Sequence, residues 1–230
     1  MIKKPFLVTV MVALSCTVLA QNLQVHYDLG DERKYLTTTI EMFRPDKLGS
    51  TFFFVDMDYD EKVSGVMGAY WEISRSFQIG KFPLQPRVEY NGGLGRVKDA
   101  PAIGYGVNSA YLAGFQYTIN APDFSKVLTL QANFKHIEKK SANDASWQLT
   151  AVWELHFFDR KLTFSGFADF WGEENLFDTE TTKTIFLAEP QLWYNFASHF
   201  SVGSEVELSS NFAGNKGFMV NPTIAIKWLF

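Results

Sequence analysis

The chain of 230 residues is 47% hydrophobic and 16% aromatic, with 21 basic and 25 acidic residues and a formal charge of −4. This mildly acidic balance argues against nucleic-acid binding, which uses a basic face or stripe. Beyond residue 20 no apolar run approaches the roughly 18 residues that a membrane-spanning helix needs, so the sequence predicts no helical membrane span. One domain of ordinary size is the simplest interpretation.

The first twenty residues have the pattern of a secretory signal peptide. Lys3 and Lys4 precede an apolar stretch, and small residues lead up to Ala20. We therefore expect residues 1–20 to be removed on export and residues 21–230 to form the mature domain. The single cysteine, Cys16, lies inside this segment, and the residues before it match the lipid-attachment motif of lipoproteins poorly. The mature domain then has no thiol, so disulfides cannot stabilise it.

From Gln21 onward, apolar residues recur with a period of two, which is typical of β-strands. Leu23 and Val25, for example, alternate with Gln24 and His26. The pattern predicts twelve strands, at residues 23–29, 35–43, 50–59, 66–77, 84–93, 108–119, 126–136, 146–157, 161–171, 184–194, 200–209 and 218–230.

The connections between these strands alternate in character. Short turns are expected at residues 44–47, 80–83, 120–123, 159–160 and 197–199. Longer and mostly polar connections fall between them, at residues 31–34, 60–65, 95–107, 137–144, 172–183 and 210–217. An even number of strands with short turns on one side and longer loops on the other is typical of outer-membrane barrels. We therefore predict an all-β fold, a transmembrane antiparallel up-and-down barrel of about twelve strands with both termini in the periplasm.

Alternation alone does not separate a membrane barrel from a soluble sandwich, but two features favour the barrel. Aromatic residues cluster near strand ends, as interfacial girdles require: Tyr27, Phe43, Tyr59, Tyr117, Phe134, Trp147, Phe157, Phe170, Tyr194 and Trp228. The last strand alternates to a C-terminal Phe230, which resembles the assembly signal of bacterial outer-membrane proteins. We therefore expect the bacterial outer membrane as the location, membrane lipid as the surroundings, and the barrel-assembly machinery as a partner during biogenesis.

If the apolar residues face lipid, the opposite parity lines a lumen. That parity carries ten acidic and three basic residues: Glu41, Asp56, Asp58, Glu72, Arg87, Glu89, Lys135, Glu154, Asp169, Glu189, Glu205, Glu207 and Lys227. Charged side chains on the lipid face would be destabilising, by about 2–4 kcal/mol for a basic residue at the bilayer midplane. Aromatic residues share the same parity: Phe52, Phe54, Tyr70, Phe167, Trp171 and Trp193.

A lumen of twelve strands is narrow, which suggests selection among solutes. An acidic wall disfavours anions, whereas aromatic rings beside carboxylates offer stacking and hydrogen bonding to neutral solutes such as nucleosides and sugars. The sequence thus predicts a passive channel rather than an enzyme, with no cofactor, no metal and no nucleic-acid partner. The residues expected to contact solute are Phe52, Asp56, Tyr70, Glu72, Arg87, Glu89, Phe167, Asp169, Trp171, Glu189 and Trp193. The alternative is that these residues form an interior network that braces the barrel.

Several segments resemble the nucleoside-specific, channel-forming (Tsx-like) outer-membrane family. They are Lys34-Tyr35-Leu36 running to Glu41-Met42-Phe43, Phe52-Phe53-Phe54-Val55-Asp56, Trp71-Glu72-Ile73-Ser74-Arg75-Ser76-Phe77 and Ser165-Gly166-Phe167-Ala168-Asp169-Phe170-Trp171-Gly172. The resemblance implies a monomeric barrel of twelve strands whose narrow channel binds nucleosides weakly. It also implies that Phe52, Asp56, Glu72, Phe167, Asp169 and Trp171 lie in the matching lumen segments. A related family with no assigned solute fits the same residues.

Two other classes of function remain open on the sequence. Ser165 and His156, with Asp159 and Asn195, supply the residue types of a lipid hydrolase or acyltransferase, although no nucleophile motif marks the serine. A plugged barrel that serves as a structural component or receptor is the other class. The acidic segment 173–180 could attract calcium, but it lacks the ordered spacing of a dedicated site, so we interpret it as a solvated loop.

Overall fold

The computed structural model describes residues 20–31, 33–60, 63, 65–138 and 145–230. The segment interpreted as a signal peptide lies outside the described residues, apart from Ala20. Among the described residues there is no helix long and apolar enough to cross a bilayer.

The described chain folds almost entirely into strands, as the period-two pattern predicts. Their bounds are β1 (Ala20–Asp28), β2 (Leu36–Asp46), β3 (Gly49–Asp60), β4 (Gly65–Phe77), β5 (Leu84–Val97), β6 (Ala100–Asn120), β7 (Lys126–Ile137), β8 (Ala145–Phe157), β9 (Leu162–Phe177), β10 (Glu180–Ala188), β11 (Gln191–Asn195), β12 (Phe200–Ser210) and β13 (Phe218–Leu229).

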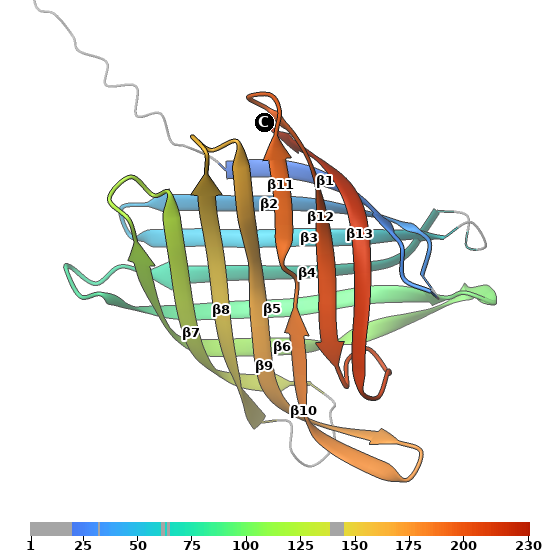
Figure 1. Ribbon diagram of the computed structural model, residues 1–230. Coiled ribbons are helices and arrows are strands. Elements are labelled where there is room, and N and C mark those ends of the chain that lie inside the picture. The colour runs from blue at the N-terminus through green and yellow to red at the C-terminus, as the bar shows by residue number, and fades with distance from the viewer. Residues whose placement is uncertain (1–19, 32, 61–62, 64, 139–144) are drawn as a thin grey trace, which may run out of the picture.

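These segments form one closed antiparallel barrel of twelve strands. Each strand pairs with its neighbour in sequence, and β1 pairs with β13 to close the sheet. The segments β10 and β11 count as one strand, because both pair with β9 on one side and with β12 on the other. In Figure 1 the front wall crosses the rear wall at a steep angle, as tilted strands on opposite sides of a barrel do. The predicted all-β, up-and-down barrel of about twelve strands is confirmed, and the periplasmic location of both termini stays a prediction.

The interruption between β10 and β11 falls at Glu189 and Pro190. Pro190 has no backbone N–H to donate to a ladder, so a regular strand cannot continue through it. Gly166 on β9 lies opposite the interruption with φ of +142°, and a Cβ on this glycine would come within 2.3 Å of the Glu189 carbonyl oxygen. The glycine therefore allows the two backbones to approach closely enough for the Glu189 amide to donate to the Phe167 carbonyl, at 3.0 Å.

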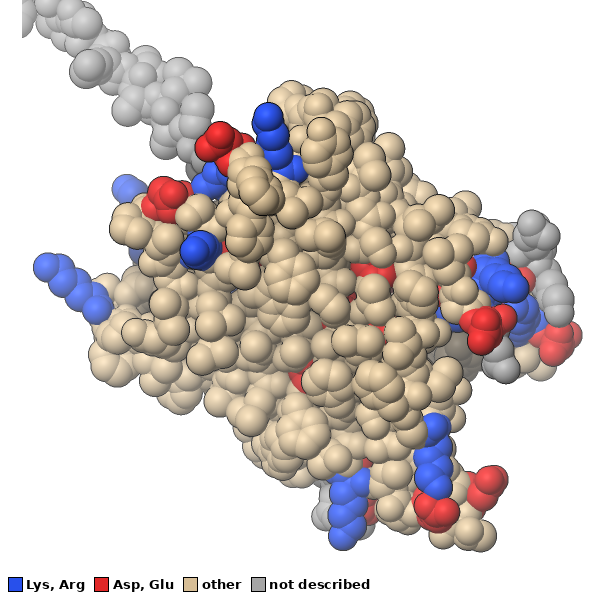
Figure 2. Space-filling model, viewed as in Figure 1, with Lys and Arg blue, Asp and Glu red and all other residues tan. Residues whose placement is uncertain are grey.

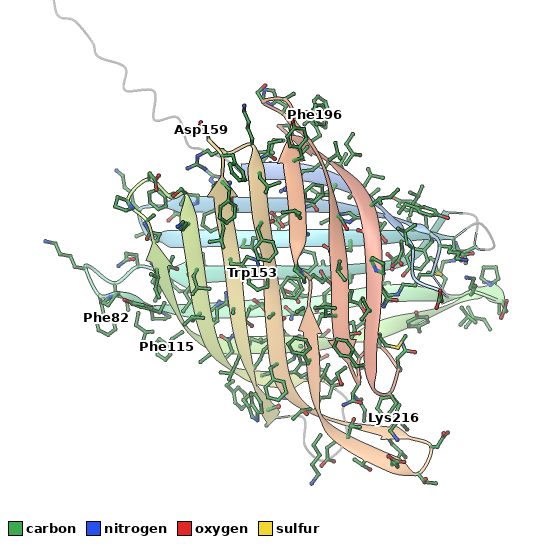
Figure 3. All side chains as sticks on the ribbon, in the orientation of Figure 1. Phe82, Phe115, Trp153, Asp159, Phe196 and Lys216 are labelled. Atoms are coloured by element: carbon green, nitrogen blue, oxygen red, sulfur yellow. The ribbon has the colours of Figure 1, made fainter. Side chains whose placement is uncertain are left out.

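The two ends of the barrel differ as the sequence predicts. The short turns and the C-terminus lie at one end, where β1 also begins, and the longer connections lie at the other (Figure 1). Figure 3 places Asp159 and Phe196 at the first end and Lys216 at the second. We refer to these as the turn end and the loop end.

Two of the expected loops are instead paired strands. Residues 95–107 form the outer part of the β5–β6 hairpin, and residues 172–183 form the outer part of the β9–β10 hairpin. Both hairpins extend past the barrel wall at the loop end (Figure 1). The glycines within residues 95–107 indicated a loop from local propensity, and cross-strand pairing overrides that propensity.

Local hydrogen bonds shape the short turns at the turn end. The Asp46 carboxylate accepts a hydrogen bond from the Leu48 backbone N–H at 2.7 Å. The Asp123 carboxylate accepts from the Ser125 backbone N–H at 3.0 Å and from its hydroxyl at 2.8 Å. The hydrogen bonds from Ser125 lower the pKa of Asp123 below its ordinary value. Such side-chain caps stabilise tight turns without a hydrophobic core.

The apolar face of the barrel points outward and the polar face inward. On β1 the buried residues are Asn22, Gln24, His26 and Asp28, while Tyr27 is 40% exposed on the opposite face. Large apolar side chains are exposed on most strands, and Figure 2 shows the middle of the visible face almost without charge, with Lys, Arg, Asp and Glu gathered near the ends. This inversion is the arrangement of a barrel surrounded by lipid.

The aromatic residues near strand ends follow the same division, with one exception. Tyr27, Tyr117, Trp147 and Trp228, among others, are exposed on the outer face. Phe43 has the parity of Glu41 and pairs with Phe52, so it faces the lumen near the turn end. Its assignment to the outer girdle was therefore wrong.

The apolar outer face predicts that a charge placed there destabilises the barrel more than the same charge placed in a turn. Ile40 lies near the middle of β2 on the lipid face, between Leu23 and Val55 of the neighbouring strands. Ile40→Arg should lower the free energy of unfolding by about 2–4 kcal/mol because the guanidinium would enter hydrocarbon. Urea titration of the protein in lipid vesicles measures this change. Leu48→Arg, in an exposed turn, is the matched control and should change stability little; equal losses would contradict the outward orientation of Ile40.

Candidate functional site: the lumen

The lumen brings together all eleven residues that the sequence selected. Ten of them have the inward parity of their strands, and the eleventh, Glu189, lies in the interruption between β10 and β11. They fall on two walls. The wall of β3, β4 and β5 contributes Phe52, Asp56, Tyr70, Glu72, Arg87 and Glu89, and the wall of β9 to β11 contributes Phe167, Asp169, Trp171, Glu189 and Trp193.

An aromatic row follows the lumen side of β3 and β4. The ring centroids of Phe52 and Phe54 lie 6.1 Å apart, and those of Phe54 and Tyr70 lie 6.0 Å apart. The Tyr70 hydroxyl donates to the Glu72 carboxylate at 2.8 Å, and the Thr39 hydroxyl donates to the Asp56 carboxylate at 2.5 Å. All these aromatic and acidic side chains are partly exposed, so water reaches this wall. We call the set Phe52, Phe54, Tyr70, Asp56 and Glu72 the aromatic–carboxylate wall.

On the other wall, both tryptophans are covered by lysines. The Lys135 ammonium lies 4.2 Å from the ring centroid of Trp171, and the Lys227 ammonium lies 4.0 Å from that of Trp193. Trp193 is fully buried, and its indole N–H donates to the Gln191 side-chain oxygen at 2.9 Å. The predicted contact between these tryptophans and solute stays a prediction, since a lysine ammonium lies over each indole ring.

A buried polar cluster fills the seam where β1 meets β13. The His26 ring packs edge-on to Trp193, with ring centroids 5.9 Å apart. Its two nitrogens lie 3.1 Å from the Thr223 hydroxyl and 2.9 Å from the Gln24 side-chain oxygen. Gln24 and Thr223 were not among the predicted lumen residues, because the prediction followed charges and aromatic rings. Extending the same parity rule to uncharged polar residues would have found them.

An arginine bridges two acidic residues on one side of the lumen at the loop end. Arg33, in the connection between β1 and β2, pairs with Asp28 at 3.3 Å and with Glu207 on β12 at 2.8 Å. Glu207 also accepts hydrogen bonds from Ser209 at 2.9 Å and Asn221 at 3.2 Å. Asp28 and Arg33 were not among the predicted residues. They add one charge of each sign, so the surplus of acids in the lumen is unchanged.

Several buried polar atoms on the wall of β5 and β7 have no hydrogen-bond partner among the described residues. They are Nη1 of Arg87, Oδ1 of Asn91, and both side-chain amide atoms of Asn133. The other terminal nitrogen of Arg87 pairs with Glu89, two residues along the same strand. Buried polar groups are usually hydrogen-bonded to protein or water. The polar atoms on this wall are therefore only partly hydrogen-bonded by the protein itself.

The hydrolase alternative is not assembled in the lumen. The His156 ring pairs with the Thr163 hydroxyl at 3.0 Å and with Glu154 at 2.9 Å, whereas Ser165 donates to Gln191 at 3.4 Å. Nucleophile and base thus have other partners, and a triad requires them within hydrogen-bond reach of each other. In the part of the chain that the structure describes, no group of three acidic, histidine or cysteine side chains could hold a metal ion. The acidic segment considered for calcium lies in the β9–β10 hairpin.

A closed barrel with an apolar outer band and a charged interior defines a β-barrel protein of the bacterial outer membrane. The chain belongs to the family described as "Domain of unknown function (DUF5020)", whose model matches residues 20–230. A comparison with curated protein sequences finds no match.

Solved porin structures share the fold. A NanC porin is 9% identical with a TM-score of 0.58, and the match covers 92% of this chain and 100% of that chain. A KdgM porin is 11% identical with a TM-score of 0.51, covering 92% and 99%. A second KdgM structure, described as a complex with disordered oligogalacturonate, has a TM-score of 0.50 at 11% identity, with the same coverage. At such identities the likeness extends to the fold alone, and nucleoside specificity stays a prediction.

The packing of the lumen predicts different roles for two of its aromatic residues. Trp193→Ala should lower the free energy of unfolding by about 3–5 kcal/mol because it leaves a cavity and removes the partner of Lys227 and His26. Phe167→Ala, at a partly exposed lumen position, is the matched control and should cost clearly less. Unfolding by urea in detergent micelles measures both. Equal losses would show that Trp193 is not the more tightly packed ring.

Proposed function

We propose that this protein is a passive outer-membrane channel for small polar solutes, with neutral nucleosides as its solute class. The observation that carries the proposal is water access inside the barrel. Val152 has inward parity yet is 37% exposed, and the side chain of Glu154, two residues on, is 57% exposed. A barrel filled by its own side chains would bury both, so their exposure supports an open path along this part of the lumen.

The aromatic–carboxylate wall supports the choice of solute. A nucleobase can stack on the rings of the Phe52, Phe54 and Tyr70 row, and ribose hydroxyls can donate to Asp56 and Glu72. Weak sites of this kind suit conduction, because a solute must leave as readily as it enters. Anions meet a repulsive wall. A ligand such as the oligogalacturonate of the KdgM complex, which carries carboxylates, would therefore be disfavoured here.

The remaining parts of the proposal follow from the same lumen. We assign solute contact to the eleven predicted residues, with Trp171 and Trp193 reachable only if their lysines move. We propose a monomer, assembled by the barrel-assembly machinery through its C-terminal strand, with no catalytic role for Ser165 or His156.

A plugged structural or receptor barrel is the second candidate. The seam cluster around His26 and the Arg33 bridge favour it, because they fill one side of the lumen with paired side chains. Planar-bilayer recording separates the two candidates, since a plugged barrel is electrically silent.

Uptake into liposomes tests the solute class. Vesicles that contain the purified protein should take up labelled adenosine at least about tenfold faster than adenosine monophosphate, because the phosphate adds negative charge in an acidic lumen. Protein-free vesicles give the background, and a neutral sugar and a neutral amino acid test discrimination among uncharged solutes. Equal uptake of nucleoside and nucleotide would contradict the proposed selectivity.

A matched pair of variants tests the aromatic row. Phe54→Leu should reduce the block of channel current by adenosine about twofold to fivefold, since one stacking surface is lost while an apolar side chain remains. Leu176→Ala, on the exposed outer part of the β9–β10 hairpin, should leave the block unchanged. Unchanged block in Phe54→Leu would remove the row from the solute path.

A further inference from the structure

In two places the lumen of this protein holds an ammonium group between an aromatic ring and carboxylates. The Lys135 ammonium over Trp171 also interacts electrostatically with four carboxylates, those of Glu72, Asp169, Glu173 and Glu89. The Lys227 ammonium over Trp193 interacts in the same way with Glu41 and Glu154. Each lysine gains attraction from the ring face and from the acids around it. Aromatic rings next to carboxylates are therefore cation sites in this barrel, and the chain fills two of them itself.

The aromatic–carboxylate wall has the same composition but no lysine. Phe52, Phe54 and Tyr70 present three rings beside Asp56 and Glu72, and among the described residues no lysine or arginine lies over any of these rings. The five side chains are partly exposed. A solute cation can therefore reach this wall, whereas the two tryptophan sites are already occupied.

Acidic groups on the opposite wall of the lumen further favour the binding of a cation. The strongest charged neighbours of Glu189 are Glu205, Asp56, Glu207 and Glu72, which are all acids from β12, β3 and β4. Within the described residues the Glu189 side chain has no hydrogen-bond or ion-pair partner, although Glu205 accepts a hydrogen bond from Gln191 at 2.6 Å. Carboxylates that face one another across a narrow lumen repel, and a cation between them offsets that repulsion.

We propose that the aromatic–carboxylate wall, together with Glu189, is also a binding site for small organic ammonium ions, so that the channel binds organic cations in addition to neutral nucleosides. Rings favour an ammonium over a hydrated metal ion, because the ammonium gives up its hydration more readily and contacts the ring face directly. The inference rests on the proposed channel for access to the lumen, but it does not depend on nucleosides as solutes.

Choline and its uncharged isostere 3,3-dimethyl-1-butanol test the site in planar bilayers. The two molecules have the same shape and differ in one charge. Choline should block the current through the full-length mature protein at a concentration at least about tenfold lower than the isostere does. Sodium at the same concentration should not relieve the block. Equal block by both molecules, or complete relief by equimolar sodium, would overturn the proposal.

Two variants assign the block to the proposed residues. Glu189→Gln removes one facing charge without breaking a hydrogen bond, and Phe54→Leu removes one ring but keeps an apolar side chain. Each should raise the half-blocking concentration of choline, by about threefold to tenfold for the first and about twofold to fivefold for the second. Asp178→Asn makes the same charge change at the exposed tip of the β9–β10 hairpin and should have no effect. Unchanged block in both lumen variants would overturn the assignment.

A binding measurement distinguishes failure of this site from failure of the channel. If the bilayer stays silent, the proposed channel function fails, and choline is then titrated calorimetrically into the detergent-solubilised barrel. Heat of binding that weakens in Phe54→Leu and Glu189→Gln, but not in Asp178→Asn, supports the cation site in a closed barrel. Absence of binding there overturns it.

Discussion

The structure depends on one constraint, the need to satisfy every backbone N–H and C=O group inside hydrocarbon. A sheet meets this need only by closing, and here the pairing of β1 with β13 removes both edges. Closure also gives each strand one face toward lipid and one toward the lumen. The interior is then the only membrane-embedded place where charged side chains remain stable, which is why nearly all the charge at membrane depth is gathered there.

The surplus of acidic side chains in the lumen is partly balanced by basic side chains, in two different arrangements. Arg33 bridges Asp28 and Glu207 at the loop end, and two lysines lie over tryptophans among carboxylates farther in. These pairs brace the barrel as an internal network would. The wall of β3 and β4 is different, since its rings and acids are partly exposed and none of the described lysines or arginines lies over these rings. The described lumen therefore has one part with paired side chains and one part that is more open, and the open part is where we propose that solute binds.

Much of the site was predictable because side-chain parity is a local property. Knowing that Glu72 faces inward requires only its own strand and the outward direction of the apolar set. Three predictions failed. Residues 95–107 and 172–183 were expected to be loops but form the outer parts of hairpins, because cross-strand pairing overrides local propensity. Phe43 was placed on the outer girdle although its parity with Glu41 directs it inward. The buried polar residues Gln24 and Asn133 were not selected as lumen residues, because they carry no charge that requires an interior position.

The twelve strands, the two ends and the identity of most lumen residues can be predicted from the sequence, because all of these follow from period-two alternation and turn chemistry along the chain. Which lumen side chains contact one another is visible only in the folded barrel. Arg33 and Glu207 are 174 positions apart in the sequence. Lys227 on β13 contacts Trp193 on β11, although β12 lies between these two strands. Such contacts depend on the register and tilt with which the sheet closes, and these are set by the whole barrel rather than by any one strand.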